Sequence, residues 1–203
     1  MAGNKQDKQA EGLPAAQPVR IFRSQEDWNQ WLEKNHRTSS GLWLKLAKRG
    51  SGLPSLTYGE ALETALCYGW IDGQKKPDTQ QMWLQRFVPR SSTSTWSKIN
   101  RDKAEALVES GRMQAAGLEA IANAKANGQW ERAYDSPSKA TVPEDLQRAL
   151  DANPRAREFF ATLNAANRYA ILFRVQTARK AETREKRIQM YVEMLERREK
   201  LHP

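Results

Sequence analysis

Six residues between positions 70 and 98 have side chains that could bind or act on a small anion. They are two tryptophans, an aspartate, two arginines and a lysine: Trp70, Asp72, Arg86, Arg90, Trp96 and Lys98. Arginine presents a planar fork of donors that matches a carboxylate or a phosphate, and an indole ring offers a large flat surface. The same residue types also occur at the edge of a packed core. The pattern therefore leaves both a ligand site and a structural role open.

Asp72 and Arg86 illustrate the two alternatives. A carboxylate beside Trp70 and an arginine could act as a general base, although such a carboxylate more often satisfies a turn or an arginine. Strand alternation places Arg86 with Met82 and Leu84. If that face is the core, the guanidinium should pair with Asp72. If the face is a groove, the guanidinium is available for an anionic ligand.

Other chemistries find little support among the residue types. Cys67 lies in an apolar helical run, which favours a core position over a nucleophile, and neither His36 nor His202 has a second histidine or a cysteine nearby. The chain has no phosphate-binding glycine loop, no dinucleotide fingerprint and no serine-hydrolase elbow. We therefore assign no catalytic residue, no metal site and no cofactor.

Composition and charge set the broad class. With 203 residues, 39% of them hydrophobic, the chain can form one or two compact domains. A single cysteine forms no internal disulfide, which suits a reducing cytoplasm, and no stretch approaches the roughly 18 apolar residues of a membrane helix. We expect a cytoplasmic protein without membrane insertion. The net charge of +9 favours anionic partners such as phosphates, acidic protein surfaces or nucleic acid.

Basic side chains recur through the last two expected helices. A solvated face is the simpler interpretation, and an anion-binding face joined by Arg86, Arg90, Lys98 and Arg101 is the sharper one. Binding of a nucleic-acid single strand would need Trp83 or Trp96 exposed beside such cations, and no nucleic-acid motif accompanies the charge. The basic residues are Arg168, Arg174, Arg179, Lys180, Arg184, Lys186 and Arg187.

The first half of the chain predicts a small antiparallel sheet with helices. Residues 1–17 are polar and are expected to form a disordered, dispensable tail. Ser24 should cap a helix that ends near residues 35–36, and residues 41–48 alternate as a half-buried strand does. A second helix, capped by Thr57 with Glu60, should close at Gly69.

After Gly69 we expect a hairpin that extends the sheet. One strand begins at Trp70, residues 75–78 have turn chemistry, and residues 81–88 form the second strand. Loop 89–95 is rich in serine and threonine.

Beyond this loop the chain reads as helical. Helices are predicted at 97–109 and 114–126, then an irregular connector over 130–142, then four helices that begin near Pro143, Asn153–Pro154, Asn164 and before Ile188. The expected fold class is α+β, with a tail at 1–17, an α+β domain at 18–112 and a helical domain at 113–203.

Four runs carry a family resemblance: ALCYGWIDGQ, LQRFVPRSSTSTWSKINRDKAEALVESGRM, VPEDLQRALDANPRAREFFATL and NRYAILFRVQTARKAETREKRI. Together they resemble the YdeI/OmpD-associated family over almost all of 19–198. The resemblance implies a bacterial cytosolic protein whose N-terminal unit is similar to the YjbR/CyaY-like fold and whose C-terminal domain is helical. One departure is Ala181, where relatives often carry proline.

The resemblance implies a role and no reaction. The family name refers to bacteriocin protection and to association with an outer-membrane porin, which suggests stress or envelope physiology. A weaker likeness to frataxin-type folds suggests iron, yet such sites need an acidic ridge, and this chain has only dispersed carboxylates.

We therefore expect a non-enzymatic binding protein with a basic and aromatic anion-binding face. The first alternative is an enzyme that acts on a small anionic substrate through a pocket around Trp70, Asp72 and Arg86. The second is non-specific nucleic-acid binding. A concavity that gathers the candidate residues would favour a ligand site.

Overall fold

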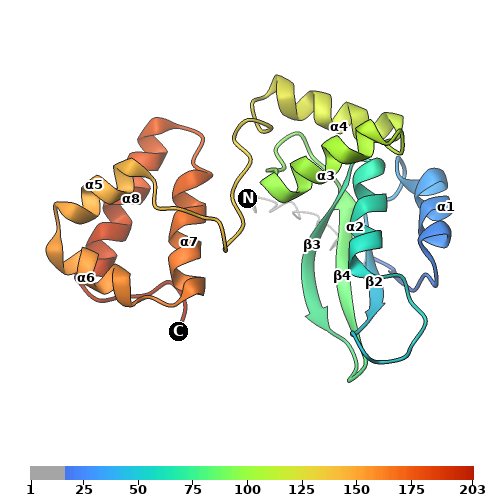
Figure 1. Ribbon diagram of the computed structural model, residues 1–203, viewed down its shortest axis with the longest axis horizontal. Helices are drawn as coiled ribbons and strands as arrows, with labels where there is room; N and C mark the ends of the chain where they lie inside the picture. The colour runs from blue at the N-terminus through green and yellow to red at the C-terminus, as the bar shows by residue number, and fades with distance from the viewer. Residues whose placement is uncertain (1–16) are drawn as a thin grey trace, which may run out of the picture. The chain divides into compact units, whose positions relative to one another are not determined.

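The computed structural model describes residues 17–203 and has the α+β fold expected from the sequence, with four strands and eight helices in this part of the chain (Figure 1). The sheet order is β1-β2-β4-β3, formed by Val19–Arg20, Leu42–Ala47, Met82–Pro89 and Trp70–Pro77. β2 and β4 are antiparallel, whereas β1 runs parallel to β2. The predicted antiparallel sheet thus gains a parallel edge strand, which was not foreseen because two residues are too few to show alternation.

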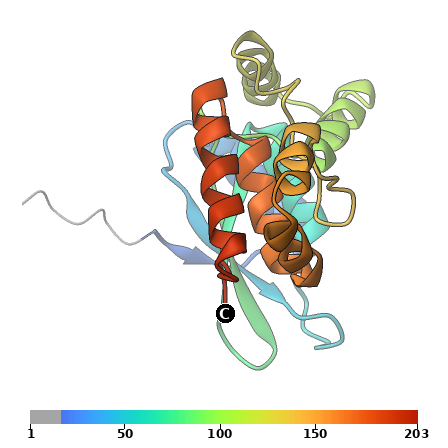
Figure 2. The same ribbon diagram turned by 90° about the vertical axis from the view of Figure 1, so that its left-hand side faces the viewer.

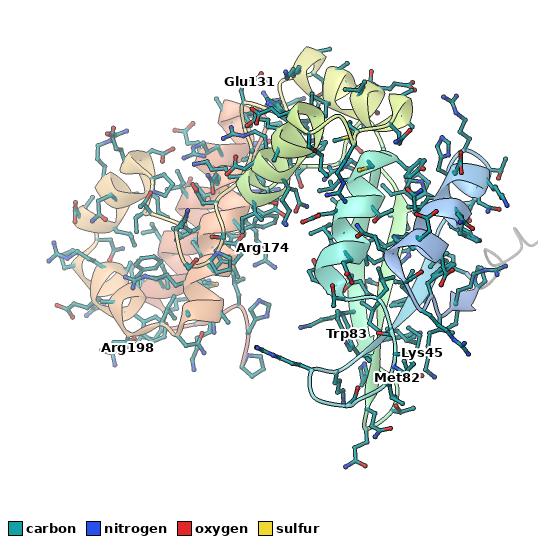
Figure 3. All side chains as sticks on the ribbon, turned by 45° about the vertical axis from the view of Figure 1, so that its right-hand side comes forward. Lys45, Met82, Trp83, Glu131, Arg174 and Arg198 are labelled. Carbon is teal, nitrogen blue, oxygen red and sulfur yellow. The ribbon has the colours of Figure 1, made fainter. Side chains whose placement is uncertain are left out.

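The alternation of β2 separates the two faces of the sheet as predicted. Leu42, Leu44 and Leu46 are buried and pair across the ladder with Phe87, Gln85 and Trp83 of β4. The other face carries Trp43, Lys45 and Ala47, paired with Arg86, Leu84 and Met82. Figure 3 shows Lys45, Met82 and Trp83 near the hairpin end of the sheet.

Two helices of this part of the chain, α1 and α2, begin at the caps predicted from the sequence. α1, Gln25–Asn35, begins with a reciprocal cap between Ser24 and Asp27. In α2, Tyr58–Cys67, Thr57 and Glu60 bond each other in the same way. Satisfying the first free N–H groups fixes where each helix starts.

The aromatic core of this part depends on Trp28 of α1. Its ring lies 5.9 Å from that of Phe87, and its indole N–H donates to the Ala61 carbonyl of α2 at 3.1 Å. The contacts join α1 to the sheet and to the first turns of α2.

The turn predicted at residues 75–78 lies further along the chain. β3 continues through Lys75 and Lys76 to Pro77, and the turn is made after it. Thr79 supplies the turn chemistry, because its N–H donates to the Met82 carbonyl and its hydroxyl accepts from Met82 N–H. Asp78 pairs with Lys45 at 2.7 Å, which holds the hairpin end against β2.

The remaining helices are close to their predicted positions: α3 Lys98–Glu109, α4 Ala115–Ala126, α5 Glu144–Asp151, α6 Pro154–Thr162, α7 Ala165–Gln176 and α8 Ala181–Glu196. Pro154 occupies the first helical position behind the Asn153 cap, as predicted. Pro143 does not; its ψ of 147° is extended, so it is the N-cap residue of α5, and Glu144 and Asp145 form an acidic first turn that suits the helix dipole.

Helices α5 to α8 share one hydrophobic cluster, and α8 packs against the other three (Figures 1 and 2). Arg184 of α8 binds Asp145 of α5 with two hydrogen bonds of 2.5 and 2.9 Å. These bonds hold the pKa of Asp145 below its usual value. A break separates α7 from α8, and Ala181 is the first residue of α8.

By contacts the described residues divide into two units, one comprising 17–62 with 71–89, and the other 63–70 with 90–203. The expectation of a disordered tail falls mostly on residues 1–16, which lie outside the described residues. Gln17 is described, and its side-chain amide donates to the Ser40 carbonyl at 2.8 Å.

Candidate anion-binding site

Arg90 and Trp96 come together where the chain leaves the sheet. The Arg90 N–H donates to the Gly69 carbonyl at 2.9 Å, which fixes the backbone just after β4. Its guanidinium carbon lies 3.5 Å from the centroid of the Trp96 ring, and Nη1 donates to the Thr95 carbonyl at 3.2 Å. Trp96 is only 3% exposed. The stack combines cation–π attraction with a fixed orientation of the guanidinium.

The loop between them is folded by its own hydroxyl groups. Ser94 N–H donates to the Ser91 carbonyl, and Ser94 Oγ accepts from Ser91 N–H. Ser91 Oγ lies 3.1 Å from the hydroxyl oxygens of Thr93 and Ser94. Short polar side chains commonly stabilise turns in this way. The serine and threonine content therefore gives the loop a defined shape.

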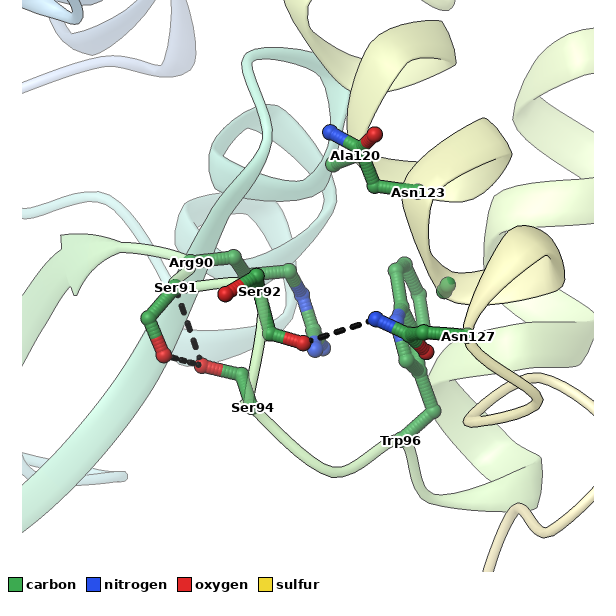
Figure 4. Close-up of a pocket in the computed structure, with 9 residues that line it drawn as sticks. Arg90, Ser91, Ser92, Ser94, Trp96, Ala120, Asn123 and Asn127 are labelled. Carbon is green, nitrogen blue, oxygen red and sulfur yellow. Dashed lines mark hydrogen bonds between the residues drawn. The ribbon is translucent and has the colours of Figure 1, made fainter.

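Helix α4 closes the other side of a small pocket (Figure 4). Asn127 Nδ2 donates to the Ser92 carbonyl at 2.8 Å and ties α4 to the loop. Asn123 lies one turn earlier on the same helix and also lines the pocket. The lining residues are Arg90, Ser91, Ser92, Ser94, Trp96, Ala120, Asn123, Ala124 and Asn127.

The lining of this pocket suits an oxyanion. It contains one guanidinium, three hydroxyl groups and two amides, and no carboxylate. The volume of about 40 Å³ exceeds what one water needs but is far below the roughly 300–1,000 Å³ of sites that enclose whole metabolites. The space matches the size of a carboxylate or phosphate head group, and the rest of a larger ligand would lie outside it.

The other candidate residues have different surroundings. Lys98 does not line the pocket; its ammonium pairs with Asp135 at 2.8 Å. Trp70 is 1% exposed at the start of β3, so its ring is part of the packed interior. Of the six residues singled out in the sequence, Arg90 and Trp96 line this pocket together.

Asp72 and Arg86 do not form the ion pair considered above. Asp72 accepts a hydrogen bond of 2.8 Å from the Tyr58 hydroxyl. Arg86 is half-buried on the Trp43 face of the sheet, where its Nε donates to Gln17 Oε1 at 2.8 Å. The buried polar residue of β4 is instead Gln85, which was not singled out in the sequence.

The serines and asparagines of the pocket were also missed. The sequence predicts a loop over residues 89–95, and the run of hydroxyl residues between Arg90 and Trp96 is a signal for this part of the lining. Asn123 and Asn127 have the i, i+4 spacing of one helix face. Nothing in the sequence says that this face meets a loop 35 positions away.

Several cations of the last two helices have protein partners. Arg184 binds Asp145, Lys186 pairs with Glu182, and Arg187 donates to the Arg174 carbonyl. Arg179 donates to the Thr93 carbonyl at 2.8 Å and so helps to hold the serine loop. These contacts give part of the basic run a structural role.

Cys67 is buried, as predicted, and burial raises the pKa of its thiol. No cluster of three or more potential metal-ligating histidine, cysteine or carboxylate side chains occurs within residues 17–203. No described helix combines the length and the hydropathy needed to cross a bilayer.

Two protein families match separate parts of the chain. Residues 139–198 match the family described as bacteriocin-protection, YdeI or OmpD-associated. This segment is similar to a YdeI/OmpD-associated domain. The resemblance stated from the sequence is thus confirmed for the C-terminal runs. Residues 20–120 match a domain of unknown function, DUF8412, which includes the first two quoted runs.

Neither the curated proteins nor the solved structures include a match to the chain. The similarity of the part before the YdeI/OmpD-associated domain to the YjbR/CyaY-like fold stays a prediction.

Proposed function

We propose that this protein is a non-enzymatic binding protein that takes the anionic head group of a ligand into the pocket between Arg90, Trp96 and α4. The observation that carries the proposal is the Arg90 guanidinium stacked 3.5 Å over Trp96 in a pocket of hydroxyls and amides without a carboxylate. Such donors bind carboxylate and phosphate oxygens through charge-assisted hydrogen bonds.

The pocket supports binding better than catalysis. Its lining has serine hydroxyls but no histidine, carboxylate or lysine to activate them as nucleophiles. The alternative of an enzyme around Trp70, Asp72 and Arg86 gains no support either, because Asp72 and Arg86 have the structural partners Tyr58 and Gln17.

The family supplies the physiological setting of this proposal. The description of the YdeI/OmpD-associated family names bacteriocin protection and OmpD. We infer a cytoplasmic bacterial protein with a role in stress or envelope physiology, whose partner is a small anionic ligand or an acidic group on another protein.

The test compares two variants that add the same charge to α4. Asn123→Asp places a carboxylate of the same shape in the pocket, whereas Ala122→Asp places one on an exposed position outside it. The probe is inorganic phosphate, with chloride holding the ionic strength constant because exposed charges respond to salt. Binding is followed by the melting temperature and by the amide NMR shifts of Ser92 and Asn127.

We expect phosphate to raise the melting temperature of the native protein and of Ala122→Asp, because a ligand of the native state stabilises it by mass action. Asn123→Asp should bind phosphate about tenfold more weakly, since like charges a few ångströms apart repel by about 1 kcal/mol or more. Equal phosphate responses in the two variants would refute the proposed pocket.

A further inference from the structure

A second cleft lies in the other unit, between the loop that follows β2 and the start of α2. It is lined by residues 47–53 and 55–59 and by Trp83, and its volume is about 610 Å³. This volume falls within the roughly 300–1,000 Å³ typical of small-molecule sites. The cleft shares no lining residue with the Arg90 pocket, and the family descriptions assign no role to it.

Two aromatic rings form a wall of this cleft. The Tyr58 and Trp83 ring centroids are 6.0 Å apart with the planes inclined at 44°. Tyr58 is 39% exposed, and its hydroxyl donates to Asp72, which orients the ring. Leu53, 40% exposed, adds apolar surface. A wall of this kind favours a flat aromatic group in the ligand.

Four cations line this cleft or the hollow next to it. Lys48 and Arg49 line the cleft, and Trp83 also lines an adjacent hollow of about 280 Å³ together with Lys75 and Lys76. No carboxylate lines either space. Asp78, at the hairpin end, is neutralised by Lys45 at 2.7 Å. The ligand should therefore carry negative charge next to its aromatic group.

We propose that this cleft binds a nucleobase that carries phosphate, with the base against Trp83 and Tyr58 and the phosphate at Arg49 or Lys75. Such a ligand is either a free nucleotide or part of a single-stranded nucleic acid. Because Trp83 lines two hollows with cations in both, the geometry favours a strand longer than one nucleotide. The proposal does not depend on the Arg90 pocket.

Substitution of Gly59 provides a test, because a larger side chain at this position can close the cleft without straining the backbone. It lines the cleft on the first turn of α2, and a Cβ built there meets only Thr57 Oγ1, at 4.0 Å. Gly50 and Gly52 are unsuitable, because their φ values of +81° and +72° disfavour other residues. Gly59→Leu fills the opening, and Gly59→Ala is the control that leaves it open.

A charge reversal provides a second pair. Arg49→Glu changes the charge in the cleft, and Arg37→Glu makes the same change at an exposed position that does not line it. The probes are a fluorescently labelled ten-nucleotide single strand of thymidylate, the matching duplex, and thymidine monophosphate as competitor. Binding is measured by fluorescence anisotropy at two salt concentrations.

We expect the native protein, Gly59→Ala and Arg37→Glu to bind the single strand more tightly than the duplex. Gly59→Leu and Arg49→Glu should bind it at least about tenfold more weakly while melting close to their controls. Competition by the monophosphate would support a free nucleotide as the ligand; its failure would support a strand. Asn123→Asp should leave strand binding unchanged, which separates this proposal from the phosphate pocket.

Two results would overturn the inference. The first is that Gly59→Leu binds the single strand as tightly as Gly59→Ala, and Arg49→Glu as tightly as Arg37→Glu. The second is no binding of the single strand or the monophosphate by the native protein at low salt, where contacts to phosphate are strongest.

Discussion

Arg86 shows how one charged residue fits a strand that is otherwise apolar. It faces the Trp43 side of the sheet, where its Nε donates to Gln17 Oε1 and the Gln17 amide donates to the Ser40 carbonyl. Because Arg86 is only half-buried, its charge stays close to solvent. The opposite, buried position is held by Gln85, whose amide donates to the Gly73 and Gln74 carbonyls. A neutral amide with its hydrogen bonds made is far less costly to bury than an unpaired guanidinium.

We therefore expect Arg86→Met to lower the free energy of unfolding by about 1 kcal/mol, the value of an ordinary hydrogen bond, rather than the roughly 3–5 kcal/mol of a broken buried ion pair. Gln17→Ala should cost a similar amount, and the double variant less than the sum, because both remove one contact. Urea unfolding measures all three. Arg20→Met, on the exposed strand β1, is the control. A loss above 3 kcal/mol would show that Arg86 has a buried charged partner.

At the scale of elements, two helical glycines have opposite surroundings. A Cβ at Gly59 of α2 meets almost nothing, whereas one at Gly117 of α4 would overlap Met113 Sδ and the Cys67 carbonyl oxygen, with the carbonyl carbon at 2.9 Å. Gly117 thus lets α4 approach the C-terminal end of α2. Gly59 lowers the helix propensity of α2 without a packing benefit, whereas the packing of α4 requires a glycine at position 117.

Gly59→Ala should therefore raise the free energy of unfolding by about 0.5–1 kcal/mol, through helix propensity and a less flexible unfolded chain. Gly117→Ala should lower it by about 1–3 kcal/mol, because overpacking outweighs the same gain in propensity. Denaturant unfolding of the two matched variants tests the contrast. Stabilisation by both would mean that α4 can move away from Cys67 at no cost.

Ala181 offers a second test at this scale. It is the first residue of α8, and Lys180 before it is extended, with φ −96° and ψ 136°. Both conditions suit a proline at position 181. Ala181→Pro should raise the free energy of unfolding by about 0.4–1 kcal/mol. Glu185→Pro, in the interior of the same helix, should lower it by about 3 kcal/mol. Destabilisation by both would place the start of α8 elsewhere.

At the scale of the whole molecule, the irregular connector 127–143 matters because Asp135 links distant segments of its unit. Its carboxylate pairs with Lys98 of α3 and accepts from Gln176 of α7 at 3.3 Å, while its carbonyl accepts from the Tyr169 hydroxyl. The hydrogen bond from Lys98 is the main reason why the pKa of Asp135 lies below its usual value. Lys98 thus has a structural role at the start of α3.

The lowered pKa of Asp135 makes its contribution to stability depend on pH. Asp135 stabilises the native state fully above the unfolded-state pKa of aspartate, about 3.9, and the contribution is lost as pH falls through the lower folded pKa. Asp135→Asn should cost about 1.5 kcal/mol at pH 7 and progressively less below about pH 4. Thermal unfolding across this pH range tests it, with Asp151→Asn, a more exposed aspartate, as control. A difference that does not depend on pH would contradict the ion pair.

The sequence alone determined several helix caps and the alternation of one strand. The cap of α1 by Ser24, the alternation of β2 and the cap of α6 by Asn153 were predictable, because each depends on residues within four positions of one another. The family resemblance of residues 139–198 was recognisable for a related reason, since the residue runs that carry it are continuous in the chain.

Only the tertiary structure decided which side chains meet. Asn127 reaches the loop at Ser92, Gln17 reaches Arg86, and Tyr58 rather than Arg86 holds Asp72. Each of these contacts joins residues at least 14 positions apart, and many alternative pairings satisfy the same local propensities. The choice among them is made by burial and by the satisfaction of polar groups over a whole unit, and neither can be computed from a short window of sequence.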